Sequence, residues 1–186
     1  MRTLLAFLLA AFVFAGCQDT EPNVDPAPDL VGESPAPPPS DAPSATVDVD
    51  RLIAAGRGSG TNLASLIDAL PRPDRTTAQP YQNRHVAGQV DTLRTYEYPG
   101  VRFTVYEVSG ANRQMLRGLT VTTDAYATEG VRVGDGRAQV EATLGAPDAR
   151  TGGDWEYRFG EPTQSDLHLA FAADTVREWR WSFYID

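Results

Sequence analysis

The sequence predicts an α+β fold: tandem αβββ repeats in which short helices pack on one face of an antiparallel sheet. Two observations support this class. Several short runs alternate apolar and polar residues, which is the pattern of strands with one buried face. Segments 60–74 and 134–148 also resemble each other, and each combines helical spacing with a helix stop, followed by three strand-like runs.

The two helical segments align with a shift of 74 residues (60 to 134), and five positions are identical. The identical pairs are Gly60/Gly134, Ala64/Ala138, Leu70/Leu144, Pro73/Pro147 and Asp74/Asp148. Thr61 and Asp135 are the expected N-caps, because their side-chain oxygens accept hydrogen bonds from unpaired backbone N–H groups. Gly145 suits the position after a helix, and Pro147 stops the helix from resuming. We therefore expect one repeat over about 60–124 and a second over about 131–186.

Three strands are expected in each repeat. They span 92–98, 101–108 and 115–123 in the first repeat, and 155–159, 167–171 and 175–185 in the second. One face of these strands carries most of the large apolar side chains: Phe103, Val105, Leu119, Val121, Trp155, Tyr157, Phe159, Leu167, Leu169, Phe171, Trp179, Trp181 and Phe183. We interpret this face as hydrophobic core rather than as a ligand-binding box, because aromatic residues are usually buried.

Residues 1–16 have the pattern of a signal peptide. Arg2 supplies a positive charge, and the apolar run Leu4–Ala15 has 12 residues, fewer than the roughly 20 that a membrane-spanning helix needs. The following Ala15-Gly16-Cys17 resembles the lipobox of bacterial lipoprotein precursors. This resemblance implies that the Cys17 thiol is diacylated and becomes the membrane anchor after cleavage before it. The alternative is an ordinary secretory peptide with a chance cysteine. By resemblance to the sorting rule of enteric bacteria, Gln18 favours the periplasmic face of the outer membrane.

Residues 17–50 are expected to form a disordered tether after the lipidated cysteine. Prolines and acidic residues crowd this segment, and no periodic apolar pattern is present. Its proline run could instead dock an SH3-like partner, although a plain spacer explains the composition. Residues 56–60, Gly-Arg-Gly-Ser-Gly, are interpreted as a flexible joint rather than as an anion cradle. The globular domain is expected over 51–186.

Composition and motifs argue against several functions. The net charge is −9 and all sixteen basic residues are arginines without a basic cluster, which argues against nucleic acid as a partner. Cys17 is the only cysteine, so no intramolecular disulfide forms. His85 and His168 lie far apart, and no zinc, EF-hand or nucleophile-elbow motif occurs. We therefore expect no metal, no cofactor and no enzymatic activity; a hydrolase is the weakest hypothesis, since a catalytic triad is spatial and the sequence does not test it.

Two surfaces are candidates for partner binding. The first is the polar face of the sheet, which is rich in arginine and tyrosine, the residue types that dominate binding hot spots. Its candidate residues are Arg102, Tyr106, Arg158, His168, Arg180 and Tyr184. The second is a long loop before the first strand that contains Arg84 and His85. The alternatives are a solvated face with Glu–Arg pairs and a polar surface excursion.

A short helix ending in Leu-Gly-x-Pro, followed by an aromatic strand and two more strands, resembles the SmpA/OmlA domain of outer-membrane assembly lipoproteins. The tandem spacing is similar to that of the β-lactamase inhibitory protein family. The residues that carry the resemblance are Gly134, Val140, Leu144, Gly145, Pro147, Trp155, Tyr157, Leu169, Phe171 and Val176. It implies a non-catalytic envelope module that binds a protein. An inhibitor or a periplasmic ligand-binding lipoprotein is the alternative.

Overall fold

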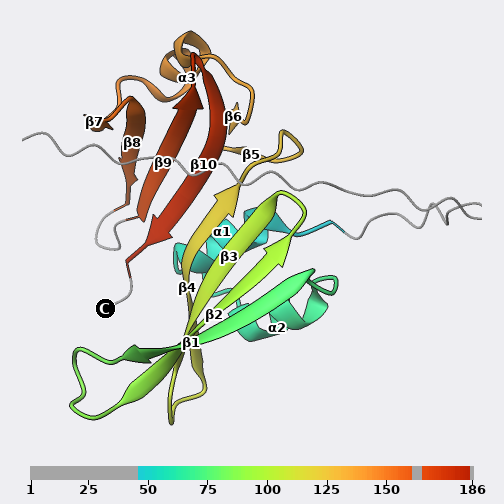
Figure 1. Ribbon diagram of the computed structural model, residues 1–186, viewed down its shortest axis with the longest axis vertical. Coiled ribbons are helices and arrows are strands. Elements are labelled where there is room, and N and C mark those ends of the chain that lie inside the picture. Colours follow the sequence, from blue (N-terminus) through green and yellow to red (C-terminus); the bar gives the residue numbers. More distant parts are fainter. Residues whose placement is uncertain (1–45, 161–164, 185–186) are drawn as a thin grey trace, which may run out of the picture. The chain divides into compact units, whose positions relative to one another are not determined.

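Eight strands of the chain form one sheet in which every neighbouring pair is antiparallel (Figure 1). The computed structural model describes residues 46–160 and 165–184. The sheet order is β1-β2-β3-β4-β10-β9-β8-β7. The strands are β1 (Arg75–Gln82), β2 (Val90–Tyr98), β3 (Val101–Val108), β4 (Arg113–Val121), β7 (Ala149–Thr151), β8 (Asp154–Phe159), β9 (Ser165–Ala172) and β10 (Thr175–Phe183). A separate two-stranded sheet contains β5 (Ala127–Thr128) and β6 (Val131–Arg132).

The pairing of β4 with β10 joins the two halves of the chain. Gly118 lies opposite Ser182, and Val121 lies opposite Trp179. Residues from both halves therefore share the two faces of a single sheet.

Three short helices accompany the sheet: α1 (Val49–Gly56), α2 (Leu63–Ala69) and α3 (Arg137–Leu144). The first two lie behind β1–β4 in the view of Figure 1 and contact β4. The third lies at the end of the β9–β10 hairpin, where the Arg137 N–H donates to the Asp174 carbonyl over 3.0 Å. The N-caps are Asn62 and Gly136, one residue beyond the expected Thr61 and Asp135. Asn62 replaces Thr61 because its side-chain oxygen accepts from the Ser65 N–H over 3.0 Å.

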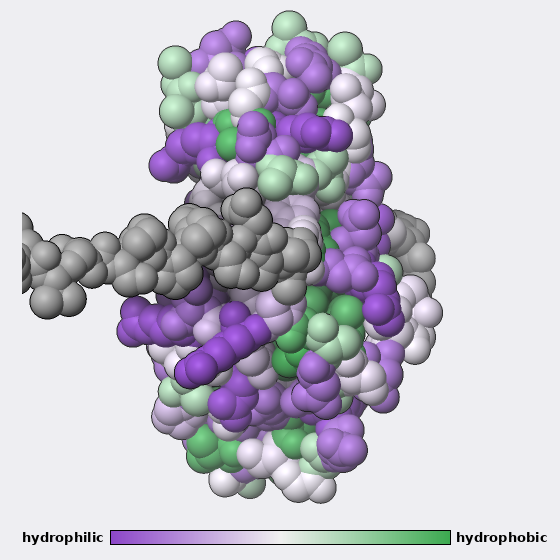
Figure 2. All heavy atoms as spheres, turned by 90° about the vertical axis from the view of Figure 1, so that its right-hand side faces the viewer, coloured by the Kyte–Doolittle hydropathy of each residue, from purple (hydrophilic) through white to green (hydrophobic). Residues whose placement is uncertain are grey.

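The hydrophobic core lies between the helices and the predicted apolar face of the sheet. Trp179, Trp181, Leu167 and Leu169 are fully buried, and Phe103 is 1% exposed. Buried residues of α1 and α2, including Leu52 and Leu66, belong to the same cluster. Figure 2 shows one side of the molecule, on which hydrophilic residues predominate and hydrophobic residues form small separate groups. The predicted core face is confirmed, although Phe159 and Phe171 are only half-buried.

The structure is α+β with a large antiparallel sheet, as predicted, but the tandem αβββ pattern is not confirmed. A fourth strand follows each predicted helix: β1 in the segment that we expected to be a loop, and β7 before the aromatic strand β8. β1 escaped detection because it is a polar edge strand that contains Pro80, and a strand at the edge tolerates proline and needs no continuous apolar face.

Described residues before 51, the expected start of the globular domain, already belong to the folded region. Val47 is 4% exposed and Val49 is 3% exposed, and α1 starts at Val49 with Asp48 as its N-cap. Gly56 approaches the Phe183 ring so closely that an added Cβ would lie 2.6 Å from it. Segment 56–60 therefore connects α1 to α2 within the domain. The predicted signal peptide, Cys17 and the tether up to residue 45 lie outside the described residues.

Candidate functional site

A row of small side chains crosses the polar face of the sheet. Thr77, Thr95, Thr104, Gly118 and Ser182 are successive cross-strand partners on β1, β2, β3, β4 and β10. Because these side chains are short, they leave a groove of about 560 Å³, which we call the Thr104 groove. Gly118 keeps this part of the groove open, since an added Cβ would lie 3.2 Å from the carbonyl oxygen of Trp181, a tight contact that a small shift would have to relieve.

Arg102 and Arg180 line one side of the Thr104 groove. Both are cross-strand partners of Thr120, so they project from the same face on either side of β4. On the next strands outward, Glu97 of β2 lies opposite Arg102, and His168 of β9 lies opposite Arg180. Arg102 and Arg180 are exposed, and no ion pair involves either of them within the described chain.

A β-bulge curves this face. The register of β3 and β4 shifts between Thr104 and Val105, which leaves Arg117 as an extra residue on β4. The Arg117 guanidinium lies 5.1 Å from the ring centroid of Tyr81 on the edge strand β1. Side chains from strands that lie three apart in the sheet meet here, so the polar face of β1–β4 is concave.

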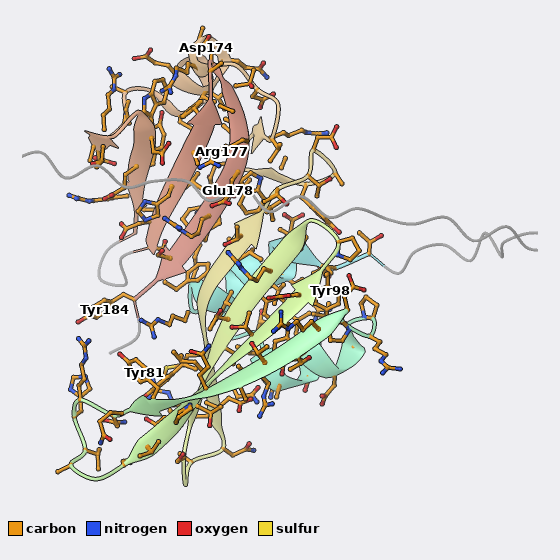
Figure 3. The ribbon with its side chains drawn as sticks, in the orientation of Figure 1. Tyr81, Tyr98, Asp174, Arg177, Glu178 and Tyr184 are labelled. Atoms are coloured by element: carbon orange, nitrogen blue, oxygen red, sulfur yellow. The ribbon has the colours of Figure 1, made fainter. Side chains whose placement is uncertain are left out.

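A second hollow of about 560 Å³ adjoins the groove and shares Arg117 with it; we call it the Tyr81 cavity. Its basic residues are Arg84, His85, Arg113 and Arg117, and its apolar and aromatic residues are Tyr81, Tyr106, Val108, Met115, Phe183 and Tyr184, with Asn83 between them. Figure 3 shows Tyr81, near the end of β1, and Tyr184, just beyond β10, on the same side of the molecule.

A buried carboxylate organises the wall of this cavity. Asp91 is 1% exposed. One oxygen accepts from the Ser109 N–H over 2.8 Å and from Gln89 Nε2 over 2.7 Å. The other accepts from Asn83 Nδ2 over 2.7 Å and from the Tyr106 hydroxyl. Burial raises the pKa of Asp91. The hydrogen bonds, of which that from Tyr106 is the strongest, lower its pKa by more than burial raises it, so the pKa lies well below its ordinary value.

The pKa of Tyr106, which donates a hydrogen bond to this carboxylate, shifts in the opposite direction. The hydrogen bond to Asp91, together with burial, raises the pKa of Tyr106. Tyr106 therefore stays a neutral hydrogen-bond donor and Asp91 stays an ionised acceptor at neutral pH. The Tyr106 ring packs edge-on against Tyr81, with 5.6 Å between the centroids.

The same network fixes the hairpin between β1 and β2. The side-chain oxygen of Asn83 accepts from the backbone N–H groups of His85 and Val86, both over 2.8 Å. Such a turn around an asparagine side chain replaces the backbone hydrogen bonds that a loop lacks. Since Asn83 also donates to Asp91, the turn is attached to a buried anchor, and Arg84 and His85 are held at the cavity.

The predicted partner-binding residues fall into three groups rather than one patch. Arg102 and Arg180 line the groove, and Tyr106, Tyr184, Arg84 and His85 line the cavity. Arg158 and His168 line neither: the Arg158 and His168 side chains lie 3.2 Å and 3.8 Å from Glu156.

Tyr106 is on the predicted face but is only 8% exposed. It is covered by Tyr81 and tied to Asp91, so its ring contributes to the cavity while its hydroxyl does not offer a surface contact.

Several residues of both sites were not predicted. Asp91, Arg113, Met115 and Arg117 carry no motif, because what makes them important is their spatial neighbours. One signal was present for the bulge: a glycine inside a strand, Gly118, often marks an irregularity or a close approach of another backbone.

Two further properties bear on the chemistry of the described chain. Over residues 46–160 and 165–184, no three His, Cys, Asp or Glu side chains are grouped so that they could hold a metal ion. In the same residues, no helix is both long and apolar enough to cross a membrane.

Comparison of the chain with protein-family models, with curated proteins and with solved structures finds no match.

Proposed function

We propose that this chain is a lipid-anchored protein of the cell envelope whose folded domain binds a protein partner through the Thr104 groove without catalysing a reaction. The observation that carries this proposal is the position of Arg102 and Arg180. They come from different halves of the chain and lie in one cross-strand row beside a floor of small side chains. Exposed arginines beside a hollow are favourable contact residues, because the planar guanidinium offers several donors and a broad surface.

The resemblance to tandem envelope modules is part of this proposal, and matching hydrogen bonds support it. The Tyr98 hydroxyl donates to the Pro71 carbonyl and the Tyr157 hydroxyl donates to the Gly145 carbonyl, each over 3.1 Å. Pro71 and Gly145 are related by the same shift of 74 residues as the helices (71 to 145). We infer that each half is one copy of a unit whose helix end is fixed to the sheet by a tyrosine, with β1 and β7 as an additional strand in each copy.

The anchor is proposed to be the lipidated Cys17, and the proline-rich segment after it would hold the domain away from the membrane. Two or three acyl chains hold a protein firmly, whereas one chain holds it marginally. Cys17→Ser should therefore abolish incorporation of radiolabelled palmitate and release the protein from the membrane fraction. Palmitate incorporation into the mutant would contradict the lipoprotein assignment.

The binding surface is tested by affinity capture from detergent-solubilised envelope. The double variant Arg102→Gln/Arg180→Gln should capture the partner much more weakly, with each hot spot contributing about 2 kcal/mol or more. The charge-matched control is Arg72→Gln/Arg177→Gln, which replaces two exposed arginines outside the groove. Capture that is equal for both double variants would exclude the Thr104 groove as the binding surface.

A second candidate function, binding of a small ligand, is favoured by one specific observation. The Tyr81 cavity is lined in part by residues of a fixed hairpin and combines apolar and basic side chains, as small-molecule sites do. This function does not exclude partner binding, because the two hollows share only Arg117.

A further inference from the structure

Among the described residues, the basic residues of the Tyr81 cavity have no acidic counterpart in its lining. Arg84, His85, Arg113 and Arg117 line it together with tyrosines, Met115 and other apolar residues, and no aspartate or glutamate of the described part of the chain is among the lining residues. This concentration of positive charge occurs in a chain whose net charge is −9. We propose that the Tyr81 cavity binds an organic anion, specifically a carboxylate attached to an aromatic or other apolar body.

The charge of the cavity is available to a ligand. Within the described chain, no ion pair involves Arg84, Arg113 or Arg117. The buried Asp91 lies behind Tyr106 and already accepts hydrogen bonds from Ser109, Gln89, Asn83 and Tyr106. Its charge is therefore used to hold the hairpin. Arginine suits the binding of a ligand carboxylate, because its fork of N–H donors matches the two carboxylate oxygens.

The apolar part of the cavity selects the body of the ligand. Tyr81 and Tyr106 meet edge-to-face with their centroids 5.6 Å apart, and Met115 and Phe183 extend the apolar wall. An aromatic ring or short hydrocarbon chain would gain contacts with these side chains while displacing water. The volume of about 560 Å³ lies within the range of about 300–1,000 Å³ that is typical of small-molecule sites.

The site is assembled before a ligand arrives. Asn83 fixes the turn that carries Arg84 and His85, and the buried Asp91 fixes Asn83. Arg117 is held over the Tyr81 ring. Because these groups are already ordered, binding does not have to order the loop, which favours affinity for a small ligand.

The first test compares two probes with the same body and different charge. The full chain in a non-ionic detergent is titrated calorimetrically with 4-phenylbutyrate and with 4-phenylbutanol. The carboxylate should bind saturably, and the neutral alcohol should bind about tenfold more weakly or worse, as expected when a charge-assisted hydrogen bond is lost. Equal binding of the two probes, or no saturable binding of the carboxylate, would overturn the proposal.

The second test removes the charge from the cavity. Arg84→Gln/Arg113→Gln should raise the Kd for 4-phenylbutyrate about tenfold or more, while the charge-matched Arg72→Gln/Arg177→Gln leaves it nearly unchanged. Both pairs consist of exposed arginines, so the fold should survive in each variant. An equal loss in both variants would show a non-specific charge effect and overturn the site.

A third readout needs no substitution at the site. The chain contains two methionines, Met1 and Met115, so labelling of the methionine methyl groups gives at most two NMR signals. The Met115 methyl should shift saturably with 4-phenylbutyrate through the ring current of the bound phenyl group, with the same Kd as the calorimetry. A Met115 signal that does not move while binding proceeds would place the ligand elsewhere.

This inference stands apart from the proposed partner groove. Arg102→Gln/Arg180→Gln, which tests partner capture, should leave 4-phenylbutyrate binding intact, because neither residue lines the Tyr81 cavity. Loss of phenylbutyrate binding in that variant would mean that the probe occupies the groove.

Discussion

The hydroxyl of Tyr106 on β3 donates a hydrogen bond to the buried carboxylate of Asp91 on β2. This bond makes Tyr106 a structural residue rather than a surface contact, although strand alternation places it on the polar face. The same carboxylate accepts a hydrogen bond from Asn83, which fixes the β1–β2 hairpin. The buried Asp91 is therefore connected, through Asn83, to the hairpin residues that line the Tyr81 cavity.

The stability of the domain should depend on Asp91 in a pH-dependent way. The folded-state pKa of Asp91 lies below its ordinary value, because the hydrogen bonds that lower it outweigh the burial that raises it. Its ionised form therefore stabilises the fold above the unfolded pKa of about 3.9, and this contribution is lost as the pH falls towards the folded pKa. Asp91→Asn should lower the Tm by several degrees at neutral pH, and the difference should shrink below about pH 4.

Circular dichroism melts of both proteins between about pH 7 and pH 2 measure this difference. The exposed Asp124→Asn is the control, and it should change the Tm little at any pH. A difference between wild type and Asp91→Asn that is independent of pH would contradict the role of the ionised carboxylate.

Two tyrosines that the sequence placed on one surface should respond differently to alanine. Tyr106→Ala should destabilise the domain by about 3 kcal/mol, because a buried aromatic residue is lost and Asp91 loses a donor. Tyr184→Ala should change the free energy of unfolding by less than about 1 kcal/mol, since Tyr184 is 64% exposed. Urea unfolding measures both, and Tyr106→Phe isolates the hydroxyl. Equal effects of the two alanine variants would refute the burial of Tyr106.

Trp181 should be a major stabilising residue of the core. It is fully buried, its Nε1 donates to Thr128 Oγ1 over 2.8 Å, and the Arg57 guanidinium lies 4.3 Å from its ring centroid. Trp181→Ala should cost about 3–5 kcal/mol. Thr128→Val, which leaves the indole N–H unpaired, should cost about 1–3 kcal/mol, whereas the exposed Thr122→Val should be close to neutral. A change below about 1 kcal/mol for Trp181→Ala is incompatible with this packing.

Residues 46–48, which precede α1, should contribute to the stability of the domain. A chain that starts at Thr46 should melt like one that starts at Cys17. A chain that starts at Val49 loses the buried Val47 and the Asp48 side chain, which accepts from the Arg51 N–H over 3.1 Å. Together the two losses should lower the free energy of unfolding by about 2 kcal/mol or more. Melting temperatures of the three chains test this contribution, and equal values would show that residues 46–48 contribute nothing.

Strand alternation in the sequence was sufficient to predict which face of the strands packs against the core. The side-chain period of a strand is two, so Trp179 and Trp181 had to share a face wherever the strand lay in the sheet. Gly145 was likewise recognisable as a helix end, because glycine adopts a positive φ without steric cost, and the structure gives it a φ of 79°. The edge strand β1 was missed, because polar residues and Pro80 give no such period.

By itself the sequence determined the fold class, the core face and the polar composition of the opposite face, since these depend on the local order of residues. Only the tertiary structure decided that Arg102 and Arg180 share a row, because that requires β4 to pair with β10. It also decided that Arg84 and Arg113 face one cavity and that Tyr81 reaches Arg117, because a bulge curves the sheet. Both sites depend on contacts between residues distant in the chain, and the local alternation of apolar and polar residues carries no information about such contacts.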